Sequence, residues 1–347
     1  MPHFNLAFLG FGNVGRALVQ LLDSKRADLR DQYGLTFTFT GVAARRLGWH
    51  ASPAGYAASD LLNGRLDTRP PHSQQPVGDL AALAEWLQAA QANVLFENTS
   101  MNPHTGQPAI DYARTALGAG VHVVTANKGP VVHAYHELRD LAASKSVRFL
   151  HEAAVMGGAP IFSLFREALP AAKLLSFRGI LNSTTNLMLT AMEQGASFDQ
   201  AVKQAQDLGI AETDPSFDVD GWDATVKVSA LATVLMDYPL KPDAITRDGI
   251  RALTPDNLRT ARMMGRPYKL VCQAQRHSDG AVTGSVRPEQ VSSDDPLAGC
   301  DGATSIIVFQ MDVIHALTLS ELHPDAVTTA YGPLADLVTI AKHRGGQ

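Results

Sequence analysis

The sequence predicts a two-domain α/β fold, in which a doubly wound parallel sheet is followed by an α+β domain with a mixed sheet. Three observations support this prediction. A glycine-rich turn separates the first predicted strand from the first predicted helix, strands and helices then alternate to about residue 150, and most later strands form a run of their own. The chain has 347 residues, which is enough for two hydrophobic cores.

Composition narrows the class of protein. The formal net charge of -5 argues against nucleic acid or an anionic membrane as the main partner. No window of about 20 apolar residues is present, so we expect no transmembrane helix, and the first residues lack the basic start of a signal peptide. Two cysteines far apart, Cys272 and Cys300, are typical of a reducing compartment. We therefore expect a cytoplasmic protein.

The first predicted strand, residues 5–9, and the first predicted helix, residues 16–25, flank a glycine-rich turn. The turn consists of Gly10, Phe11, Gly12, Asn13, Val14 and Gly15. This G-x-G-x-x-G spacing between a strand and a helix is the fingerprint of a Rossmann-type dinucleotide-binding domain. Gly10 permits the tight turn, Gly12 lets a pyrophosphate approach the backbone, and Gly15 allows close helix packing. Amides at the helix N-terminus then bind the phosphates.

The second predicted strand, residues 35–44, ends in Arg45 and Arg46 rather than in the acid that binds a ribose 2′-hydroxyl. An arginine here can pair with the 2′-phosphate of NADP, although two solvated loop arginines explain the pattern equally well. The sequence thus favours NADP, with NAD still possible. Residues 47–78 are rich in Gly, Ser and Pro, so we expect an irregular excursion with at most one short helix.

Regular alternation resumes after residue 78. Helices are predicted over residues 79–90, 106–120 and 133–145, and strands over residues 93–100, 121–129 and 147–155. Ligands of such parallel sheets bind at the carboxyl ends of the strands. Thr99 and Ser100 end one strand, and Lys128 ends the next. Lys128 is well placed for a nicotinamide or its substrate, but a lone lysine at a strand end is commonly just solvated.

The chain changes character from about residue 133. After a buried strand, Gly157 and Gly158 can expose carbonyl oxygens to a cation beside Glu152, or they can simply form a strand-to-helix turn. Further helices are predicted over residues 160–170, 184–195, 197–209, 254–265 and about 324–343, and strands over residues 173–183, 268–277, 281–291, 304–312 and 315–322. We expect the last helix to pack back on the first domain.

Residues 222–236 are typical of a buried helix that carries one acid and one base. Asp223 and Lys227 are four residues apart and so share one helical face. On a surface such a pair contributes only about 0.3–0.5 kcal/mol, whereas charges in an apolar wall are costly unless paired or used. The preceding loop is acidic and contains Glu212, Asp214, Asp218 and Asp220. The apolar flanks and the acidic loop favour a functional site over a surface ion pair.

These motifs together resemble the homoserine dehydrogenase family along most of the chain. The segments that carry the resemblance are GFGNVG at 10–15, NTS at 98–100, TANKGP at 125–130, HEAAVMGGAP at 151–160, GILNSTTN at 179–186 and LGIAETDPSFDVDGWDATVK at 208–227. The last three in this order are specific to that family among dinucleotide enzymes. The resemblance implies reversible reduction of L-aspartate 4-semialdehyde to L-homoserine by NAD(P)H, on the pathway to threonine and methionine.

The resemblance also implies roles for individual residues. Lys227 would donate a proton to the carbonyl oxygen during reduction and act as the base in reverse, which suits a lysine whose pKa burial lowers. Asp223 would hold the substrate amino group or orient Lys227. Lys128 would reach both cofactor and substrate. The expected substrate-binding residues are Glu212, Asp218 and Thr184.

Two further properties follow from the resemblance. The first is a monovalent cation, sodium or potassium, held by Glu152 and the carbonyl groups of Val155, Gly157 and Ala159. The second is a homodimer, formed through the second domain. Residues 1–150 would form the NAD(P)-binding Rossmann domain, and residues 151–320 the substrate, catalytic and dimerisation domain.

The sequence departs from the family pattern at two places. Ser183 stands where the family usually has glycine in an LNGTTN-like turn, which would tighten the substrate pocket. The segment 321–337 lacks the Gly-Ala-Gly turn expected before the last helix, which affects the loop over the cofactor more than the reaction. The chain ends soon after that helix, so we expect no regulatory amino-acid-binding domain, no kinase domain and no threonine feedback through such a domain.

Two other functions fit part of the sequence. A phosphorylating semialdehyde dehydrogenase would need a thiolate nucleophile with a histidine partner, yet neither cysteine lies at a strand-to-helix turn of the predicted catalytic half. A non-catalytic NADP-binding protein would explain the glycines but not Asp223 and Lys227 in an apolar helix. Cysteine alkylation would inactivate the first of these, and binding without turnover would support the second.

Overall fold

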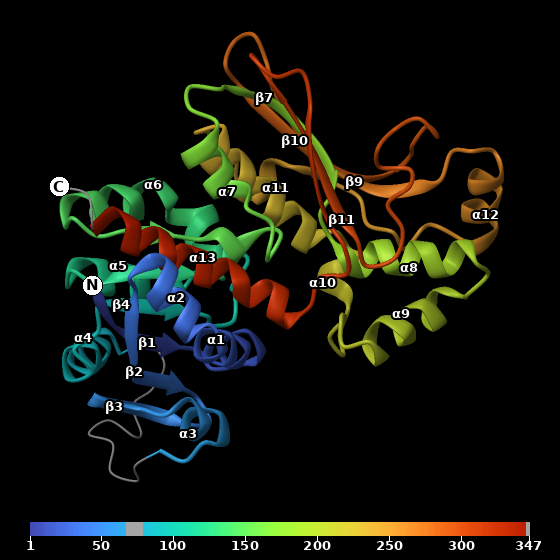
Figure 1. Ribbon diagram of the computed structural model, residues 1–347. Helices are drawn as coiled ribbons and strands as arrows, with labels where there is room; N and C mark the ends of the chain where they lie inside the picture. Colours follow the sequence, from blue (N-terminus) through green and yellow to red (C-terminus); the bar gives the residue numbers. More distant parts are fainter. Residues whose placement is uncertain (67–78, 345–347) are drawn as a thin grey trace. The chain divides into compact units, whose positions relative to one another are not determined.

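The computed structural model describes residues 1–66 and 79–344, which fall into two compact units (Figure 1). Unit 1 comprises Met1–Pro160 together with the C-terminal segment that starts at Asp325, and unit 2 comprises Ile161–Pro324. Each unit is built on its own six-stranded sheet. The predicted α/β class is therefore confirmed.

Unit 1 has the doubly wound arrangement, with the strand order β3-β2-β1-β4-β5-β6. Its strands are β1 (His3–Leu9), β2 (Thr36–Ala44), β3 (Gly48–Tyr56), β4 (Val94–Glu97), β5 (His122–Thr125) and β6 (Phe149–Leu150). Its helices are α1 (Asn13–Ser24), α2 (Arg26–Tyr33), α3 (Ala58–Asn63), α4 (Leu80–Ala89), α5 (Ala109–Gly118), α6 (Lys128–Ser144), the short 3-10 turn η1 (Glu152–Ala154) and α13 (Ala326–Arg344). Neighbouring strands are parallel except for β2 and β3.

Aromatic side chains from the strands of this sheet contribute to the hydrophobic core of unit 1. The rings of Phe8 and Phe96 stack with their centroids 5.1 Å apart, and Phe39 lies 5.9 Å from Phe8 on the other side. All three side chains are fully buried. Because they come from β1, β4 and β2, they tie together the strands that carry the glycine turn and the neighbouring strand ends.

The prediction of an irregular excursion over residues 47–78 was wrong in its first part. Residues 48–56 form β3, an antiparallel edge strand, and a short helix, α3, follows it; residues 67–78 lie outside the described residues. Pro53 and Gly55 hide the strand from sequence patterns, but an edge strand tolerates both. Trp49 packs edge-on against Trp86, whose indole nitrogen donates a 2.8 Å hydrogen bond to the carbonyl of His50.

The C-terminal helix α13 packs against α1, α2, β5 and η1 within unit 1. A Cβ on Gly332 would lie 2.5 Å from the carbonyl oxygen of Gly157 and 2.9 Å from the amide nitrogen of Ala153. Glycine at position 332 thus lets the helix approach the segment after β6. That strand is shorter than predicted, because residues 152–154 form η1 instead of extending it.

Unit 2 contains a mixed sheet in the order β12-β11-β7-β9-β10-β8. Its strands are β7 (Leu174–Ile180), β8 (Thr246–Arg247), β9 (Tyr268–Arg276), β10 (Val282–Gln290), β11 (Ser305–Met311) and β12 (Leu317–Glu321). Its helices are α7 (Ile161–Ser163) with the π-helical turn η2 (Leu164–Ala168), α8 (Ser183–Glu193), α9 (Phe198–Asp207), α10 (Ser216–Val219), α11 (Trp222–Leu235), the 3-10 turn η3 (Pro242–Ala244) and α12 (Pro255–Met263). Only β8 and β10 pair in parallel.

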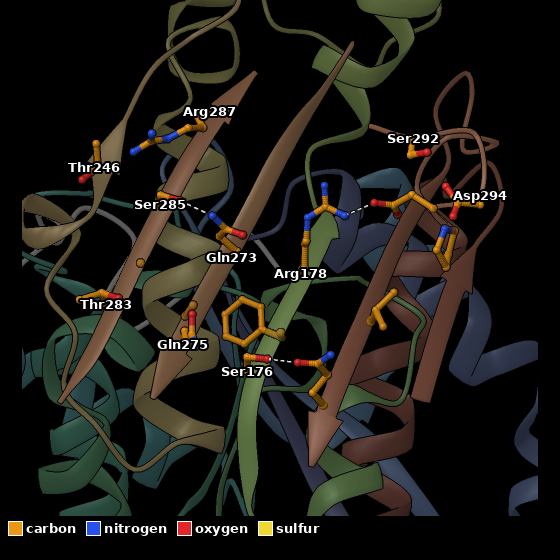
Figure 2. A pocket seen from close by; sticks show the side chains of 17 residues that line it. Ser176, Arg178, Thr246, Gln273, Gln275, Thr283, Ser285, Arg287, Ser292 and Asp294 are labelled. Atoms are coloured by element: carbon orange, nitrogen blue, oxygen red, sulfur yellow. Dashed lines mark hydrogen bonds and ion pairs between the residues drawn. The ribbon is translucent and has the colours of Figure 1, made fainter. Parts of the chain in front are cut away.

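Helix α11 packs on one face of this sheet, against β9 and β10. The approach is close, since a Cβ on Gly284 would lie 3.2 Å from a methyl carbon of Val228. The opposite face carries a groove of about 790 Å³ lined by polar side chains from β7, β9 and β10, among them Ser176, Gln273 and Ser285 (Figure 2). None of the helices in residues 1–66 and 79–344 has the length and apolar character needed to cross a lipid bilayer.

Candidate active site

The glycine turn after β1 has the geometry that its fingerprint requires. Gly10 has a φ of 87°, and a Cβ there would lie 2.4 Å from the carbonyl oxygen of Asn98. A Cβ on Gly15 would lie 3.0 Å from the carbonyl oxygen of Gly10, whereas nothing lies within 4 Å of the same position on Gly12. Gly12 precedes α1 and brings no side-chain cap. Open space and uncapped amides at this helix start suit an anion.

A cavity of about 850 Å³ lies beside this turn. Six of the residues predicted to bind a cofactor line it: Gly10, Phe11, Gly12, Arg45, Thr99 and Ser100. Asn13, Val14 and Gly15 form the first turn of α1 next to it. Asn98, the first residue of the NTS segment at 98–100, also lines the cavity. Its side-chain nitrogen and oxygen are buried and have no hydrogen-bond partner within the described residues, as expected for a group that a ligand satisfies.

The arginine pair lies at the rim of the same cavity. Arg45 and Arg46 occupy the turn between β2 and β3, where Ala44 pairs with Gly48, and both side chains are exposed. The pairing of β2 with β3, a strand that was not predicted, therefore closes the turn that carries the two arginines. Two guanidinium groups at the rim and no acid at the end of β2 leave this region suited to a phosphate.

Buried Glu97 links the two neighbouring strand ends. Its carboxylate accepts hydrogen bonds from the amide of Thr99 at 2.8 Å and from the hydroxyl of Thr125 at 2.7 Å. The Asn127 side chain donates to the Thr99 carbonyl at 3.2 Å and accepts from the Gly129 amide at 2.9 Å, so it caps α6. Burial raises the pKa of Glu97, and these hydrogen bonds oppose the rise. Lys128 is the first residue of α6, whereas the sequence pattern placed it at the end of a strand.

The segment after β6 contains the four residues predicted to bind a cation. Glu152, Val155 and Ala159 are buried and Gly157 is half-buried. The amide of Glu152 donates a 2.8 Å hydrogen bond to the carboxylate of Asp336 on α13. No cluster of three or more His, Cys, Asp or Glu side chains that could hold a metal occurs in residues 1–66 and 79–344. One carboxylate with backbone carbonyls still fits the oxygen ligands of a hard cation.

Asp223 and Lys227 form a buried ion pair on α11. The ammonium nitrogen lies 2.9 Å from the carboxylate, and the two side chains are only 12% and 14% exposed, respectively. Lys227 also donates a 2.6 Å hydrogen bond to the carbonyl of Leu181. Burial acts to lower the pKa of Lys227, but the attraction and hydrogen bond of Asp223 outweigh it and leave this pKa above its ordinary value. The expected fall in the lysine pKa was therefore wrong.

Asn182, which belongs to the segment 179–186 that carries the family resemblance, lies at the centre of this site. Its side-chain nitrogen donates to the carboxylates of Asp218 at 2.7 Å and Asp223 at 2.9 Å. Its side-chain oxygen accepts from the amide of Thr185 at 2.8 Å and so caps α8. The helix starts of α8 and α11 and the short helix α10 thus converge on one amide group.

The remaining predicted substrate residues lie around this centre. Thr184 is buried at the start of α8, with its hydroxyl 3.4 Å from the carbonyl of Ile210. Asp218 belongs to α10. Glu212 is exposed, and its carbonyl accepts a 3.1 Å hydrogen bond from Gln206. The structure thus brings Lys227, Asp223 and Asp218 together, while Glu212 lies on the exposed loop beside them.

Neither cysteine has the surroundings of a nucleophile. Burial raises the pKa of Cys272 to about 12 and that of Cys300 to about 11. Both thiols are free and buried. A thiol with so high a pKa contains almost no thiolate at neutral pH, so the alternative that requires a cysteine nucleophile loses its chemical basis.

The site of unit 2 can therefore give a proton rather than form a covalent bond. A protonated ammonium beside two carboxylates can stabilise and protonate an oxygen that gains negative charge. The acidic side chains of Asp218 and Asp223 also suit a substrate that brings an amino group. Unit 1 independently provides a cavity of about 850 Å³ beside the glycine turn.

Comparisons with known proteins point to one family. The family model described as homoserine dehydrogenase matches residues 160–338, and the one described as its NAD-binding domain matches residues 10–152. An NAD(+)-dependent homoserine dehydrogenase of Pseudomonas canavaninivorans is 38% identical over 342 residues, which cover 98% of this chain and 97% of the relative.

Solved structures give the same result. A putative homoserine dehydrogenase of Archaeoglobus fulgidus superimposes with a TM-score of 0.84 at 28% identity, covering 98% of this chain and 99% of the other. A hyperthermophilic archaeal homoserine dehydrogenase in complex with NADPH has a TM-score of 0.80 at 27% identity, covering 99% and 98%. Fold, family models and relatives agree along almost the whole chain, which is therefore a member of the homoserine dehydrogenase family of NAD(P)-dependent oxidoreductases.

Proposed function

We propose that this chain carries out the reaction of its family, the reversible NAD(P)H-dependent reduction of L-aspartate 4-semialdehyde to L-homoserine, with Lys227 as the proton-transfer residue. The observation that supports this most is the buried Asp223–Lys227 pair in unit 2. A surface pair would need no function, but a pair this well shielded from water costs free energy unless it is used or fully compensated.

Lys227 acts as an acid during reduction. Its raised pKa keeps it protonated at neutral pH, so the ammonium can hydrogen-bond the aldehyde oxygen and donate a proton as negative charge develops there. The nicotinamide cofactor supplies the hydride when bound. In the reverse direction, neutral Lys227 accepts the proton of the homoserine hydroxyl. Asp223 holds Lys227 in place, and Asp218, Thr184 and Glu212 bind the rest of the substrate.

Unit 1 holds the cofactor in this proposal. The pyrophosphate lies against Gly12 and the amides at the start of α1, where a Cβ would find no neighbour within 4 Å. Thr99, Ser100 and Lys128 approach the nicotinamide end from the strand ends that Glu97 joins. Residues 1–150 with the last helix thus serve the cofactor, and residues 151–320 serve substrate and assembly.

NADP is the preferred cofactor in this proposal. Arg45 lines the cavity in a turn without an acid, and its guanidinium group can pair with a 2′-phosphate. NAD is the second candidate, favoured by the name of the Pseudomonas canavaninivorans relative. Initial rates of L-homoserine oxidation with each cofactor distinguish the two. We expect a higher kcat/KM with NADP than with NAD in the wild type, and a selective loss of that preference in Arg45→Ser. A higher kcat/KM with NAD in the wild type would favour NAD, and an unchanged NADP/NAD ratio in Arg45→Ser would rule out Arg45 as the source of the preference.

A sodium or potassium ion binds after β6 in this proposal, through Glu152 and the carbonyls of Val155, Gly157 and Ala159. The oxygen-only ligand set and the burial of Glu152 support it. Thermal unfolding in sodium, potassium and tetramethylammonium chloride tests it without turnover. Specific stabilisation by a small cation, lost in Glu152→Gln, is expected, and identical melting in all three salts would contradict it.

The protein forms a homodimer through the polar sheet face of unit 2. Successive residues of a strand point to opposite faces, so Cys272 faces α11 while Gln273 and Gln275 line the groove on the other side (Figure 2). Analytical ultracentrifugation should give a dimer that Gln275→Arg weakens, and a monomeric wild type would refute the assembly.

Two free buried thiols are also in keeping with the expected cytoplasmic location.

A further inference from the structure

Asp336 lies on the C-terminal helix α13 (red in Figure 1) and is only 1% exposed. A carboxylate so well buried costs free energy unless it has partners. One of these partners is the backbone amide of Glu152, which donates a 2.8 Å hydrogen bond to the Asp336 carboxylate across 184 positions of the sequence. Asp336 therefore contacts the segment 152–159, which contains the four residues predicted to bind a cation.

The Glu152 amide takes its partner from outside its own turn. Glu152 is the first residue of η1, and the first amides of a helical turn have no acceptor within it. His151, the residue before the turn, provides no side-chain cap to it. The Asp336 carboxylate accepts this hydrogen bond from α13, and an ionised acceptor makes such a bond stronger than a neutral one. A distant helix thus caps the turn that begins with the predicted charged ligand.

Two further residues of α13 contact the same segment. Thr329, Gly332 and Asp336 are three and four positions apart, so they share one face of the helix. A Cβ on Gly332 would lie 2.5 Å from the Gly157 carbonyl oxygen, and a Cβ on Gly157 would lie 2.7 Å from the Thr329 hydroxyl oxygen. The two backbones therefore touch, and the Gly157 carbonyl, a predicted cation ligand, lies directly against α13.

A site made of one carboxylate and three backbone carbonyls depends on the conformation of the whole segment, because the carbonyls converge only where the backbone is fixed. The amide of Ala159 donates to the carbonyl of Met156 at 3.1 Å, which fixes the far end of the segment from within. Its near end is fixed by Asp336 from α13. Residues that orient metal ligands without touching the metal typically change its affinity about 10–100-fold when they are replaced.

We propose that Asp336 is a positioning residue of the cation site. By capping the turn that begins at Glu152, it holds the segment 152–159 in the conformation that binds sodium or potassium. The proposal rests on the cation assignment of the proposed function and deepens it. It makes the C-terminal helix part of the cation site, through a carboxylate that acts on the backbone of a ligand residue and is not itself a ligand.

Asp336→Ala tests this role without turnover. The Tm is measured against the concentration of sodium or potassium chloride, with tetramethylammonium chloride keeping the ionic strength constant. A cation that binds only the folded protein raises Tm once its concentration exceeds its Kd. We expect the curve of Asp336→Ala to move to cation concentrations about tenfold higher or more. A curve at the wild-type position would overturn the proposal.

Asp325→Ala is the matched control. The Asp325 carboxylate accepts a 2.7 Å hydrogen bond from the amide of Thr328 at the start of the same helix. This variant therefore also removes a capping carboxylate, but one that caps α13 itself. Its Tm should fall at every cation concentration, while the curve keeps its position along the concentration axis. A shift as large as that of Asp336→Ala would show that weakening of α13, and not the cap on Glu152, changes cation binding.

Asp336→Asn decides the question if Asp336→Ala does not fold. Its side-chain oxygen can still accept from the Glu152 amide, so its curve should stay close to that of the wild type. A folded Asp336→Asn without a cation response would overturn the capping role.

The failure of the cation assignment has a different signature. A wild type that melts identically in all three salts would end that assignment and the role of Asp336 with it. A wild type that responds, beside an Asp336→Ala that responds equally, would overturn the role of Asp336 alone. Because none of these measurements needs turnover, the reaction assigned to the protein is judged separately.

Discussion

The ammonium of Lys227 lies 2.9 Å from the carboxylate of Asp223, one turn earlier on α11, with both side chains nearly excluded from water. The same unit contains a natural comparison on α9, where Lys203 and Asp207 have the same spacing but are 68% and 62% exposed. The two pairs therefore have the same spacing along the helix but differ in their exposure to water. The exposed pair provides matched controls for each substitution of the buried one.

Asp223→Asn should move the pH dependence of L-homoserine oxidation. The base in that direction is neutral Lys227, and the Asp223 carboxylate raises its pKa, so wild-type kcat/KM should increase with pH into the alkaline range. Without the carboxylate, burial dominates and the pKa of Lys227 falls. The rising limb should therefore shift to lower pH. Steady-state rates across pH measure this shift, with Asp207→Asn as the control that leaves the profile in place.

Gly10→Ala and Gly12→Ala should separate stability from cofactor binding. A Cβ on Gly10 would lie 2.4 Å from the Asn98 carbonyl at a φ of 87°, so this variant should lose several degrees in Tm. A Cβ on Gly12 meets nothing within 4 Å, so that variant should fold normally but bind NADPH more weakly. Differential scanning calorimetry and fluorescence titration with NADPH test the pair. Normal NADPH affinity in Gly12→Ala would contradict the assigned phosphate position.

Lys269→Met should destabilise unit 2 through a buried charge. Lys269 is 1% exposed and donates to the Cys300 carbonyl at 2.6 Å and to the carboxylate of Asp301 at 2.8 Å. The loss should be smaller than the roughly 3 kcal/mol typical of a broken buried pair, because the Asp301 side chain is 38% exposed and keeps its contact with Arg262. Urea unfolding measures the loss, and Lys203→Met should be nearly neutral. An equal loss of unfolding free energy in Lys269→Met and Lys203→Met would show that the buried ion pair is not the cause of the destabilisation.

The cluster of Lys269, Asp301 and Arg262 also predicts how the stability of the protein changes in acid. Burial would raise the pKa of Asp301, but Lys269 and Arg262 lower it overall. A carboxyl group with a depressed folded-state pKa provides stability above its unfolded pKa, and that stability is lost as pH falls through the folded value. The difference in unfolding free energy between wild type and Lys269→Met should therefore shrink in acid.

Local spacing explains what the sequence could predict. The glycine turn and the Asp223–Lys227 pair involve residues within one turn or one helix, so periodicity and propensity place them correctly. The edge strand β3 was missed because its pairing with β2, and the contact of Trp49 with Trp86, override a composition rich in Gly, Ser and Pro.

The contacts that organise the site could not be predicted, for a different reason. Asn182 reaches Asp223 across 41 positions, and Glu97 reaches Thr125 across 28. Such contacts exist only after the strands and helices have assembled, so a local pattern can mark a residue but cannot show which distant side chain it reaches. The direction of the Lys227 pKa also depended on assembly, because burial and the nearby carboxylate act in opposite directions and only the folded geometry decides which one prevails.

The most direct test of the central claim is the rate of L-aspartate 4-semialdehyde reduction by NADPH in wild type, Lys227→Met and Lys203→Met. We predict a loss in kcat of about 10²–10⁴-fold in Lys227→Met, with a normal fold and normal NADPH affinity. The activity of Lys203→Met should equal that of wild type. Wild-type turnover in Lys227→Met would contradict the assignment of Lys227 as the proton donor.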